Sequence, residues 1–336
     1  MTDARQQPMA VIGAGSWGTA LAIQLARAEH PIHLWGRDPA QLDAMQRVRC
    51  NERYLPDAAF PPALRVSLDL ASALDGVRDA LIAVPSHAFR ATLEHVAVYL
   101  KPDTRIAWAT KGFEMSSGLL PHQIAGEILG ERPGAVLSGP TFAREVGAGL
   151  PTAMTVASRD AAFAKELASR LTGPNFRAYM QTDIMGVEVG GAVKNVIAIG
   201  SGIADGMGFG ANTRVALITR GLAEMMRLGV RLGASRETFM GLAGLGDLVL
   251  TCTDDQSRNR RLGLALGRGR SMQEAESSIR QVVEGVLAAR AVCAVAEQQS
   301  VEMPICREVF RIVHEGKPVR DAVQDLMGRE MRSETE

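Results

Sequence analysis

One lysine of this sequence stands in surroundings that would make its side chain reactive. Lys194 lies in a stretch of Val, Ile, Ala and Gly, and no other charged side chain occurs between Glu188 and Asp205. Burial lowers the pKa of a lysine toward neutrality, where the ammonium can exchange a proton with a substrate. A lysine that only extends from a buried helix to the surface is the commoner interpretation. Here the adjacent glycines and Asn195 favour a proton-transfer site.

The stretch around Lys194 is expected to form a helix that is rich in glycine. Gly190 and Gly191 precede the lysine and share its face of the helix, and Gly200 and Gly202 follow it. Each interior glycine costs about 1 kcal/mol of helix stability relative to alanine. We therefore expect close approach of another group, and room beside the amine at Gly190 and Gly191 for a small molecule.

Two later stretches could complete such a site. Asp247 is a carboxylate among glycine and apolar residues; pairing with Lys194 would let both charges be buried, although a purely structural pair explains it equally well. Ser257, Arg258 and Asn259 open a predicted helix. The free N–H groups at its start would join a hydroxyl, a guanidinium and an amide around a phosphate. A solvated basic surface is the commoner meaning of such a run.

The N-terminal segment has the pattern of a dinucleotide site. A short apolar run leads into Gly13, Gly15 and Gly18 in the spacing G-x-G-x-x-G, and a helical sequence follows. In that context the first glycine makes the turn, the second lets the backbone approach a pyrophosphate, and the third lets the helix pack on the strand. Ser16 and Trp17 also lie in this loop, and for Trp17 a packing role is the plain alternative.

The residues after the second predicted strand bear on the choice of cofactor. This strand, Ile32–Trp35, is followed by Gly36, Arg37 and Asp38. In an NAD-selective site an acidic residue at this place accepts hydrogen bonds from the ribose hydroxyls. Arg37 stands about where that acid would be, and an arginine can pair with a 2′-phosphate, which favours NADP(H) over NAD(H). Asp38 is the counter-argument, because a slightly longer strand would bring its carboxylate to the ribose.

Polar groups follow the carboxyl ends of further predicted strands. Lys111 follows one apolar strand, and Gly139 and Thr141 follow the next. Ligands of open parallel sheets bind at that edge, so we expect Lys111 to face the nicotinamide half of the cofactor and the substrate. His87, after an earlier strand, is a less favoured acid–base candidate. Residues 51–62, NERYLPDAAFPP, are predicted to form a turn-rich loop.

The order of the predicted elements indicates two domains. Strands and helices alternate up to about residue 182, which is the pattern of an α/β, Rossmann-type, doubly wound sheet. The strand pattern then stops and only helices are predicted. We therefore expect a dinucleotide-binding domain at 1–185 and an all-helical substrate and catalytic domain at 186–336. The helices predicted after that of Lys194 are Thr213–Leu232, 256–266, 282–299 and 304–314.

Length and composition set the class of protein. The chain has 336 residues, of which 46% are hydrophobic and 22% charged, as in a soluble protein with two cores. No segment approaches the ~20 unbroken apolar residues of a membrane span, and the polar N-terminus lacks a secretory signal, so we expect a cytoplasmic location without membrane insertion. The 37 basic and 37 acidic residues balance, which argues against nucleic acid as a partner. No metal site is expected, because the cysteines, Cys50, Cys252, Cys293 and Cys306, lack metal-ligand spacing.

The stretch from Gly191 to Asn212, G-A-V-K-N-V-I-A-x-G-x-G-I-x-D-G-M-x-F-G-x-N, resembles the signature of the bacterial-type NAD(P)-dependent glycerol-3-phosphate dehydrogenases. The resemblance implies that Lys194 accepts the proton of the substrate hydroxyl. It also implies substrate contacts at Lys111, Gly139, Thr141, Lys194, Asp247, Ser257, Arg258 and Asn259. The cofactor contacts that it implies are Gly13, Gly15, Ser16, Trp17, Gly18, Arg37, Lys111, Ala143, Arg258, Val283 and Glu284.

The resemblance implies reversible hydride transfer between NAD(P)H and dihydroxyacetone phosphate, which gives sn-glycerol 3-phosphate for glycerophospholipid synthesis. A homodimer is an expectation from the family alone. Two alternatives stay open. A related two-domain NADP-dependent reductase of a 2-oxo or 3-hydroxy acid would use a lysine on the same helix but would need a carboxylate clamp. A non-catalytic dinucleotide sensor would have little need for Lys194 in an apolar groove.

Overall fold

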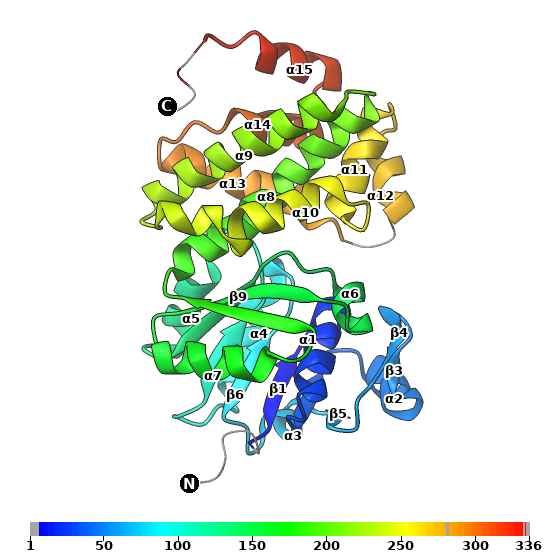
Figure 1. The fold of residues 1–336 in the computed structure, drawn as a ribbon, viewed down its shortest axis with the longest axis vertical. Coiled ribbons are helices and arrows are strands. Elements are labelled where there is room, and N and C mark those ends of the chain that lie inside the picture. Colours follow the sequence, from blue (N-terminus) through cyan, green and yellow to red (C-terminus); the bar gives the residue numbers. More distant parts are fainter. Residues whose placement is uncertain (1–6, 280–281, 332, 334–336) are drawn as a thin grey trace.

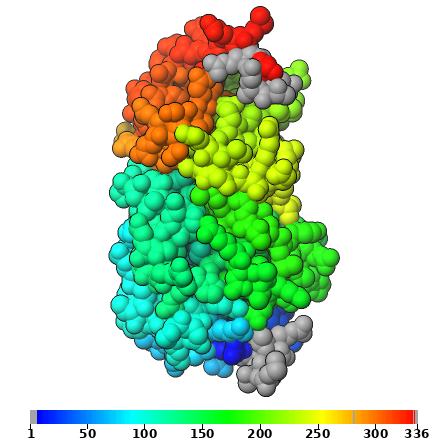
Figure 2. All heavy atoms as spheres, turned by 90° about the vertical axis from the view of Figure 1, so that its left-hand side faces the viewer, coloured from blue at the N-terminus to red at the C-terminus, as the bar shows by residue number. Residues whose placement is uncertain are grey.

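The chain forms two stacked parts in the computed structural model, which describes residues 7–279, 282–331 and 333. A sheet flanked by helices makes up the N-terminal part, and helices alone make up the C-terminal part (Figure 1). Figure 2 shows the two parts in contact, with the blue to green residues at one end and the orange and red residues at the other. The fold class predicted from the sequence is confirmed.

The sheet has eight strands in the order β10-β9-β8-β7-β6-β1-β2-β5. Its inner strands are apolar on both faces because helices cover both: on β1, Met9 and Val11 pack into one core and Ala10 and Ile12 into the other. The strands are β1 (Met9–Ile12), β2 (Ile32–Trp35), β5 (Leu64–Val66), β6 (Asp79–Ile82), β7 (Arg105–Trp108), β8 (Gly134–Ser138), β9 (Thr152–Ser158) and β10 (Phe176–Gln181).

The strand order places a crevice beside β1. The chain builds the sheet to one side through β2 and β5 and then to the other side through β6 and β7, all parallel to β1. Such a reversal leaves an opening at the carboxyl ends of the strands on either side of it. Strand β9 differs from a fully parallel arrangement, because it runs antiparallel to β8, and β10 is parallel to β9.

Helices cover both faces of the sheet. The face of Met9 and Val11 is covered by α1 (Ser16–Arg27), α2 (Pro39–Val48), α6 (Ala143–Ala148) and α7 (Ala161–Leu171), and the opposite face by α3 (Leu70–Leu74), α4 (Ser86–Ala97) and α5 (Pro121–Leu129). The prediction of a loop at 51–62 is wrong. A hairpin of β3 (Cys50–Asn51) and β4 (Leu55–Ala59) forms there, because Leu55 and Ala58 are buried against α6 at Gly147.

Helix α8 (Ile184–Gly206) is the core of the C-terminal part. It is long and apolar enough to cross a membrane, but 89% of its apolar window is buried inside the protein, so it is a central packing helix. Around it lie α9 (Ala211–Arg231), η1 (Arg236–Met240), η2 (Leu242–Gly246), α10 (Asp247–Thr253), α11 (Arg258–Gly267), α12 (Met272–Ile279), α13 (Glu284–Gln298), α14 (Pro304–Glu315) and α15 (Val319–Met327). The predicted helices match α9, α11, α13 and α14, with ends that differ by at most two residues.

Glycines let α11 cross α8 at backbone contact. A Cβ atom at Gly202 of α8 would lie 2.1 Å from the carbonyl oxygen of Arg260. In the other direction, a Cβ atom at Gly263 of α11 would lie 2.1 Å from the carbonyl oxygen of Ile199. Any larger side chain would push the two helices apart. The close approach that the sequence predicted at Gly202 is therefore made by another helix of the same chain.

A buried carboxylate joins the two parts. Glu188 lies on α8, yet its Oε1 accepts hydrogen bonds from Trp108 Nε1 at 2.7 Å and from the backbone N–H of His122 at 3.0 Å. Its Oε2 lies 2.5 Å from His122 Nδ1. Trp108 ends β7 and His122 begins α5, so the start of α8 is hydrogen-bonded into the sheet part.

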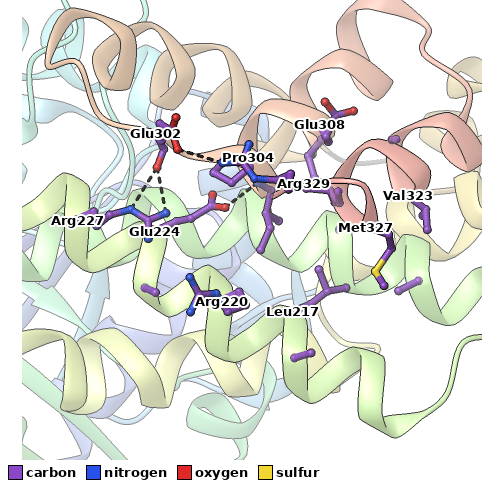
Figure 3. A pocket seen from close by; sticks show the side chains of 18 of the residues that line it. Leu217, Arg220, Glu224, Arg227, Glu302, Pro304, Glu308, Val323, Met327 and Arg329 are labelled. Carbon is purple, nitrogen blue, oxygen red and sulfur yellow. Dashed lines mark hydrogen bonds and ion pairs between the residues drawn. The ribbon is translucent and has the colours of Figure 1, made fainter. Parts of the chain in front are cut away.

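A cavity of about 1120 Å³ lies between α9, α14 and α15 and shares no residue with the cleft described below. Arg220 of α9 and Met327 of α15 line it from opposite sides (Figure 3). At its wall the carboxylate of Glu224 accepts hydrogen bonds from the N–H groups of Ile305 and Cys306, at 2.6 and 3.1 Å, in the first turn of α14. Burial outweighs these contacts and raises the pKa of Glu224 to about 7.

Candidate active site

The predicted site residues come from both parts of the chain and meet around one cleft. The cleft has a volume of about 1930 Å³ and extends from the carboxyl ends of β1 and β2 to α8, α11 and the start of α13. Gly18, Gly139 and Asp247 lie behind its lining. The predicted residues in the lining are Gly13, Gly15, Ser16, Trp17, Arg37, Lys111, Thr141, Ala143, Lys194, Ser257, Arg258, Asn259, Val283 and Glu284.

The three glycines of the first loop have three different surroundings. Gly13 has φ +125°, and a Cβ there would lie 2.3 Å from the carbonyl oxygen of Ala83. A Cβ at Gly18 would lie 1.9 Å from the carbonyl oxygen of Gly13, so α1 packs closely on the loop. At Gly15 no atom lies within 4 Å of the Cβ position, so the backbone is open to the cleft. This is the space that a pyrophosphate needs.

Side chains that the sequence did not single out hold this loop in place. The carbonyl oxygen of Ala14 accepts hydrogen bonds from Asn51 Nδ2 at 3.0 Å and from Gln41 Nε2 at 2.8 Å. Trp17 packs partly against the sheet core, and its buried Nε1 has no hydrogen-bond partner among the described residues. The open backbone at Gly15 and this unpaired donor at the cleft fit a polar ligand such as a dinucleotide.

The end of β2 has the placement that the sequence predicted. The strand ends at Trp35, and Arg37 is exposed in the wall of the cleft. The carboxylate of Asp38 caps α2 by accepting from the N–H of Gln41 at 3.2 Å. It also pairs with Arg53 at 3.2 Å. Arg37 and Asp38 both line the cleft, and the carboxylate of Asp38 has partners within the protein.

Two lysines from different parts of the fold share one buried carboxylate. Lys194 Nζ of α8 lies 2.5 Å from Asp247 Oδ1, and Lys111 Nζ, which follows β7, lies 2.7 Å from Asp247 Oδ2. Lys194 also donates to Thr251 Oγ1 at 3.1 Å. Asp247 is only 1% exposed, while both lysines reach the cleft. The predicted pairing of Lys194 with Asp247 is present, and Lys111 is a second partner.

The charges of this cluster shift its titration. Burial lowers the pKa of Lys194 to about 8; Asp247 opposes that shift and Lys111 adds to it. Burial acts to raise the pKa of Asp247, but the two ammonium groups outweigh it and hold that pKa below its usual range. The result is an ionised carboxylate beside an ammonium that can lose its proton just above neutral pH.

The glycines beside Lys194 make room for the chain itself. A Cβ at Gly190 would lie 2.5 Å from the carbonyl oxygen of Ala243, and one at Gly191 would lie 3.2 Å from Cγ of Lys111. Gly191 thus lets the stem of Lys111 pass along α8 to Asp247. The expectation that these two glycines leave space for a small molecule is wrong, because η2 and Lys111 fill that space.

The start of α11 faces the same cleft. Ser257 caps the helix by accepting from the N–H of Arg260, and Arg258 lines the cleft. The Asn259 amide is held on both sides: its Oδ1 accepts from the N–H of Gly285 and its Nδ2 donates to Asn195 Oδ1, both at 2.8 Å. Asn259 therefore ties α11 to α13 and α8 at the point where the predicted phosphate contacts lie.

The remaining predicted residues lie at the ends of neighbouring elements. Thr141 Oγ1 donates to the carbonyl oxygen of Gly139 at 3.2 Å. Ala143 begins α6, and Glu284 begins α13 with Val283 just before it. His87 also lines the cleft, in the first turn of α4. No set of three or more His, Cys, Asp or Glu residues suited to a metal ion occurs in the part of the chain that the structure describes.

Two site residues were missed or not assigned from the sequence. Thr251, which accepts a hydrogen bond from Lys194, is four residues beyond Asp247 on the same helix. That spacing would have found it had α10 been predicted as a helix. Asn195 follows Lys194 directly and was noticed, but its partner Asn259 could not be read from the sequence because the two lie on different helices.

Two family models cover most of the chain. Residues 8–164 match the model described as NAD-dependent glycerol-3-phosphate dehydrogenase N-terminus, and residues 183–324 match the model for the C-terminus. The chain belongs to the NAD-dependent glycerol-3-phosphate dehydrogenase family. The resemblance found in the sequence is confirmed.

Relatives within the family are similar over nearly their whole length. The chain is 56% identical to glycerol-3-phosphate dehydrogenase (NAD(P)+) of Edwardsiella ictaluri, over 97% of each chain. It is 53% identical to that of Tolumonas auensis, over 97% of this chain and 98% of the relative. The crystal structure of glycerol-3-phosphate dehydrogenase from Coxiella burnetii has 48% identity and a TM-score of 0.93, and covers 96% of this chain and 99% of its own. These matches favour the glycerol-3-phosphate prediction over a 2-oxo or 3-hydroxy acid reductase.

Proposed function

We propose that this protein catalyses the reversible reduction of dihydroxyacetone phosphate to sn-glycerol 3-phosphate with NAD(P)H. The observation that carries the proposal is the meeting of Lys194 and Lys111 on Asp247, within the cleft that also holds the glycine loop. Both ammonium groups reach the cleft beside an ionised carboxylate. A carbonyl that gains a hydride must also gain a proton, and Lys194 can supply it.

In this mechanism each residue of the cluster has one task. The dinucleotide supplies or accepts the hydride when it is bound. Lys194 gives its proton to the oxygen on C2 of the substrate during reduction and takes it back during oxidation. Asp247 holds the lysine ammonium in position, and Thr251 Oγ1 accepts a second hydrogen bond from it. Lys111 places a positive charge where negative charge develops on the oxygen.

The phosphate of the substrate is assigned to the start of α11. Arg258 would pair with it, while Ser257, Asn259 and the first N–H groups of the helix provide further contacts. These residues lie in the same cleft as Lys194, on a helix that packs directly on α8. Binding energy from the phosphate then holds C2 at the lysine.

The cofactor preference is proposed to be NADP(H). The placement of Arg37 in the wall of the cleft supports this, since a guanidinium can pair with a 2′-phosphate. The engagement of Asp38 with α2 and Arg53 also supports it, because the carboxylate has partners other than a ribose. We expect Arg37→Ala to lower kcat/KM for NADPH several-fold more than for NADH. An unchanged ratio in the variant would remove Arg37 from this role.

Several further properties follow from the family and are proposed with the function. The product serves glycerophospholipid synthesis, the protein acts in the cytoplasm and does not insert into membranes, and it forms a homodimer. The division into a dinucleotide-binding domain at 1–185 and a substrate and catalytic domain at 186–336 is proposed on the same footing. Size-exclusion chromatography with light scattering measures the oligomeric state directly.

One assay separates the proposed reaction from its alternatives. Oxidation of NADPH and NADH is followed with dihydroxyacetone phosphate as the only carbonyl compound, and in parallel with a set of 2-oxo acids. Rapid oxidation with the phosphorylated triose alone supports the proposal. Oxidation only with a 2-oxo acid would identify the related reductase, and cofactor binding without oxidation in either mixture would identify a sensor.

A further inference from the structure

Arg260 lies behind the proposed phosphate contacts and has no access to the cleft. It follows Arg258 and Asn259 on α11, but unlike them it is absent from the lining of the cleft. Its side chain is 9% exposed. The guanidinium therefore cannot act as the phosphate ligand. The sequence alone does not distinguish it from its neighbours, because Arg258, Arg260 and Arg261 stand in one short basic run.

The guanidinium of Arg260 instead holds the loop that leads into α11. Its Nη1 donates to the carbonyl oxygen of Cys252 at 3.1 Å, at the end of α10. Its Nε donates to Asp255 Oδ1 at 2.9 Å, within the loop. The backbone N–H of Arg260 donates to Ser257 Oγ at 3.2 Å. The guanidinium thus fixes the beginning and the middle of the loop, and the backbone N–H contributes to the cap of the helix that carries the phosphate contacts.

The same guanidinium is anchored on α8. Nη1 of Arg260 pairs with Oδ2 of Asp205, whose side chain is 7% exposed. Arg214 of α9 pairs with the same carboxylate through Nε and Nη2, both at 2.9 Å in their shortest contacts. Asp205 and Lys194 both lie on α8, whose backbone contacts that of α11 at Gly202 and Gly263. The loop is therefore fixed to the same helix that carries Lys194.

We propose that Arg260 is a positioning residue for the substrate phosphate: by tying Cys252 and Asp255 to Asp205 of α8, its guanidinium sets the distance between the phosphate contacts of α11 and the proton carried by Lys194. This inference rests on the proposed function, because it takes the start of α11 as the phosphate site. Loss of these ties shifts the phosphate contacts relative to Lys194, and a misplacement of about 1 Å can cost on the order of 100-fold in rate.

The test compares substrates with and without the phosphate group. The ratio of kcat/KM for dihydroxyacetone phosphate to kcat/KM for dihydroxyacetone is measured at high enzyme concentration for the wild type, Arg260→Met and Arg260→Lys. This ratio does not depend on the fraction of active protein, so partial misfolding does not alter it. We expect it to fall about 10- to 100-fold in Arg260→Met, and less in Arg260→Lys, while KM for the nicotinamide cofactor stays within about twofold.

Arg214→Met is the matched control. It removes the other partner of Asp205, while Asp205 keeps Arg260. The hydrogen bonds of Arg214 go to Asp205, and its influence on the loop is a longer-range attraction to Asp255. We expect the ratio in Arg214→Met to stay at the wild-type value. Equal ratios in the wild type and both Arg260 variants, or an equal fall in Arg214→Met, would overturn the positioning role.

Arg258→Ala separates this inference from the function beneath it. If the phosphate lies at the start of α11, Arg258→Ala raises KM for dihydroxyacetone phosphate, lowers kcat and lowers the substrate ratio several-fold to a hundredfold. If the substrate ratio is unchanged in Arg258→Ala, the phosphate binds elsewhere and the proposed phosphate site at the start of α11 is wrong. A ratio that falls in Arg258→Ala but not in the Arg260 variants would end only the positioning role.

Discussion

Lys194 should be indispensable for turnover but not for holding the cofactor. In Lys194→Ala we expect kcat to fall at least about 100-fold, since general acid–base groups contribute 10²–10⁴-fold, while the Kd of NADPH changes only a few-fold. Steady-state kinetics and fluorescence titration measure the two. Lys165→Ala, on the exposed face of α7, is the control and should behave as wild type. More than about a tenth of wild-type activity at neutral pH would exclude Lys194 as the proton carrier.

The pH dependence of the reaction should report the pKa of Lys194. Reduction needs the protonated amine, so its kcat is expected to fall as pH rises through about 8, and oxidation to rise over the same range. The positive charge of Lys111 lowers that pKa, so Lys111→Met should move the fall in reduction to higher pH. The pH profile of kcat at saturating substrate measures the shift. A profile of Lys111→Met that falls at lower pH than the wild type would contradict the geometry of the cluster.

At the scale of residues the sequence indicated which side chains share the cleft better than it indicated the contacts between them. The lone lysine in an apolar helix and the lone carboxylate at Asp247 indicated their pairing, because neither charge is tolerated alone in such surroundings. The second partner, Lys111, is far away in sequence, so no spacing rule could join it to Asp247. The glycines were read as space for a ligand because a sequence cannot say whether the approaching atom belongs to the protein.

At the scale of elements, the crossing of α8 and α11 should tolerate no side chain. Gly202→Ala would place its Cβ 2.1 Å from a backbone oxygen, so we expect a loss of about 1–3 kcal/mol or more in the free energy of unfolding. Urea denaturation measures it. Gly126→Ala in α5 is the matched control, because no atom lies within 4 Å of its Cβ position; it should be neutral or stabilising by up to about 1 kcal/mol. Equal stability of the two variants would mean that the helices are not in backbone contact.

The cap of α14 should make stability depend on pH. The pKa of Glu224 is raised to about 7 in the folded protein, so its contribution is fully present below the unfolded pKa near 4.5 and is lost as pH rises through 7. Relative to Glu224→Gln, the wild type should therefore lose free energy of unfolding between pH 5 and pH 8. Urea denaturation at both values of pH tests this, with the exposed Glu237→Gln as control. A constant difference between wild type and Glu224→Gln would contradict the shift.

Elements were predicted where burial imposes a clear period and missed where it does not. The apolar runs of β1, β6 and β7 and the long helices α9 and α13 were found for that reason. Helix α10, helix α12 and the β3–β4 hairpin are short, and the hairpin contains a proline, so local pattern alone was too weak. The reversed direction of β9 could not be predicted, because the alternation of apolar residues is the same in either direction.

At the scale of the whole molecule, the active cleft exists only where the two parts meet. The glycine loop comes from the sheet, the proposed phosphate contacts come from α11, and Asp247 receives one lysine from each part. The order of strands before helices was enough to predict the two parts and the edge of the sheet at which the cleft lies. Their relative placement was not predictable, because it depends on contacts between residues distant in the chain.

The hydrogen bonds of Glu188 bear on how enzymes of this family can be recombined. This carboxylate lies on the C-terminal side of the predicted boundary at 185, but its partners Trp108 and His122 lie on the N-terminal side. A chimaera that joins the N-terminal half of one relative to the C-terminal half of another would bury the carboxylate against foreign neighbours. When α8 is exchanged between relatives, positions 108 and 122 should therefore be exchanged with it. The boundary between the two parts in space differs from the boundary between them along the chain, because α8 is hydrogen-bonded to residues of the N-terminal part.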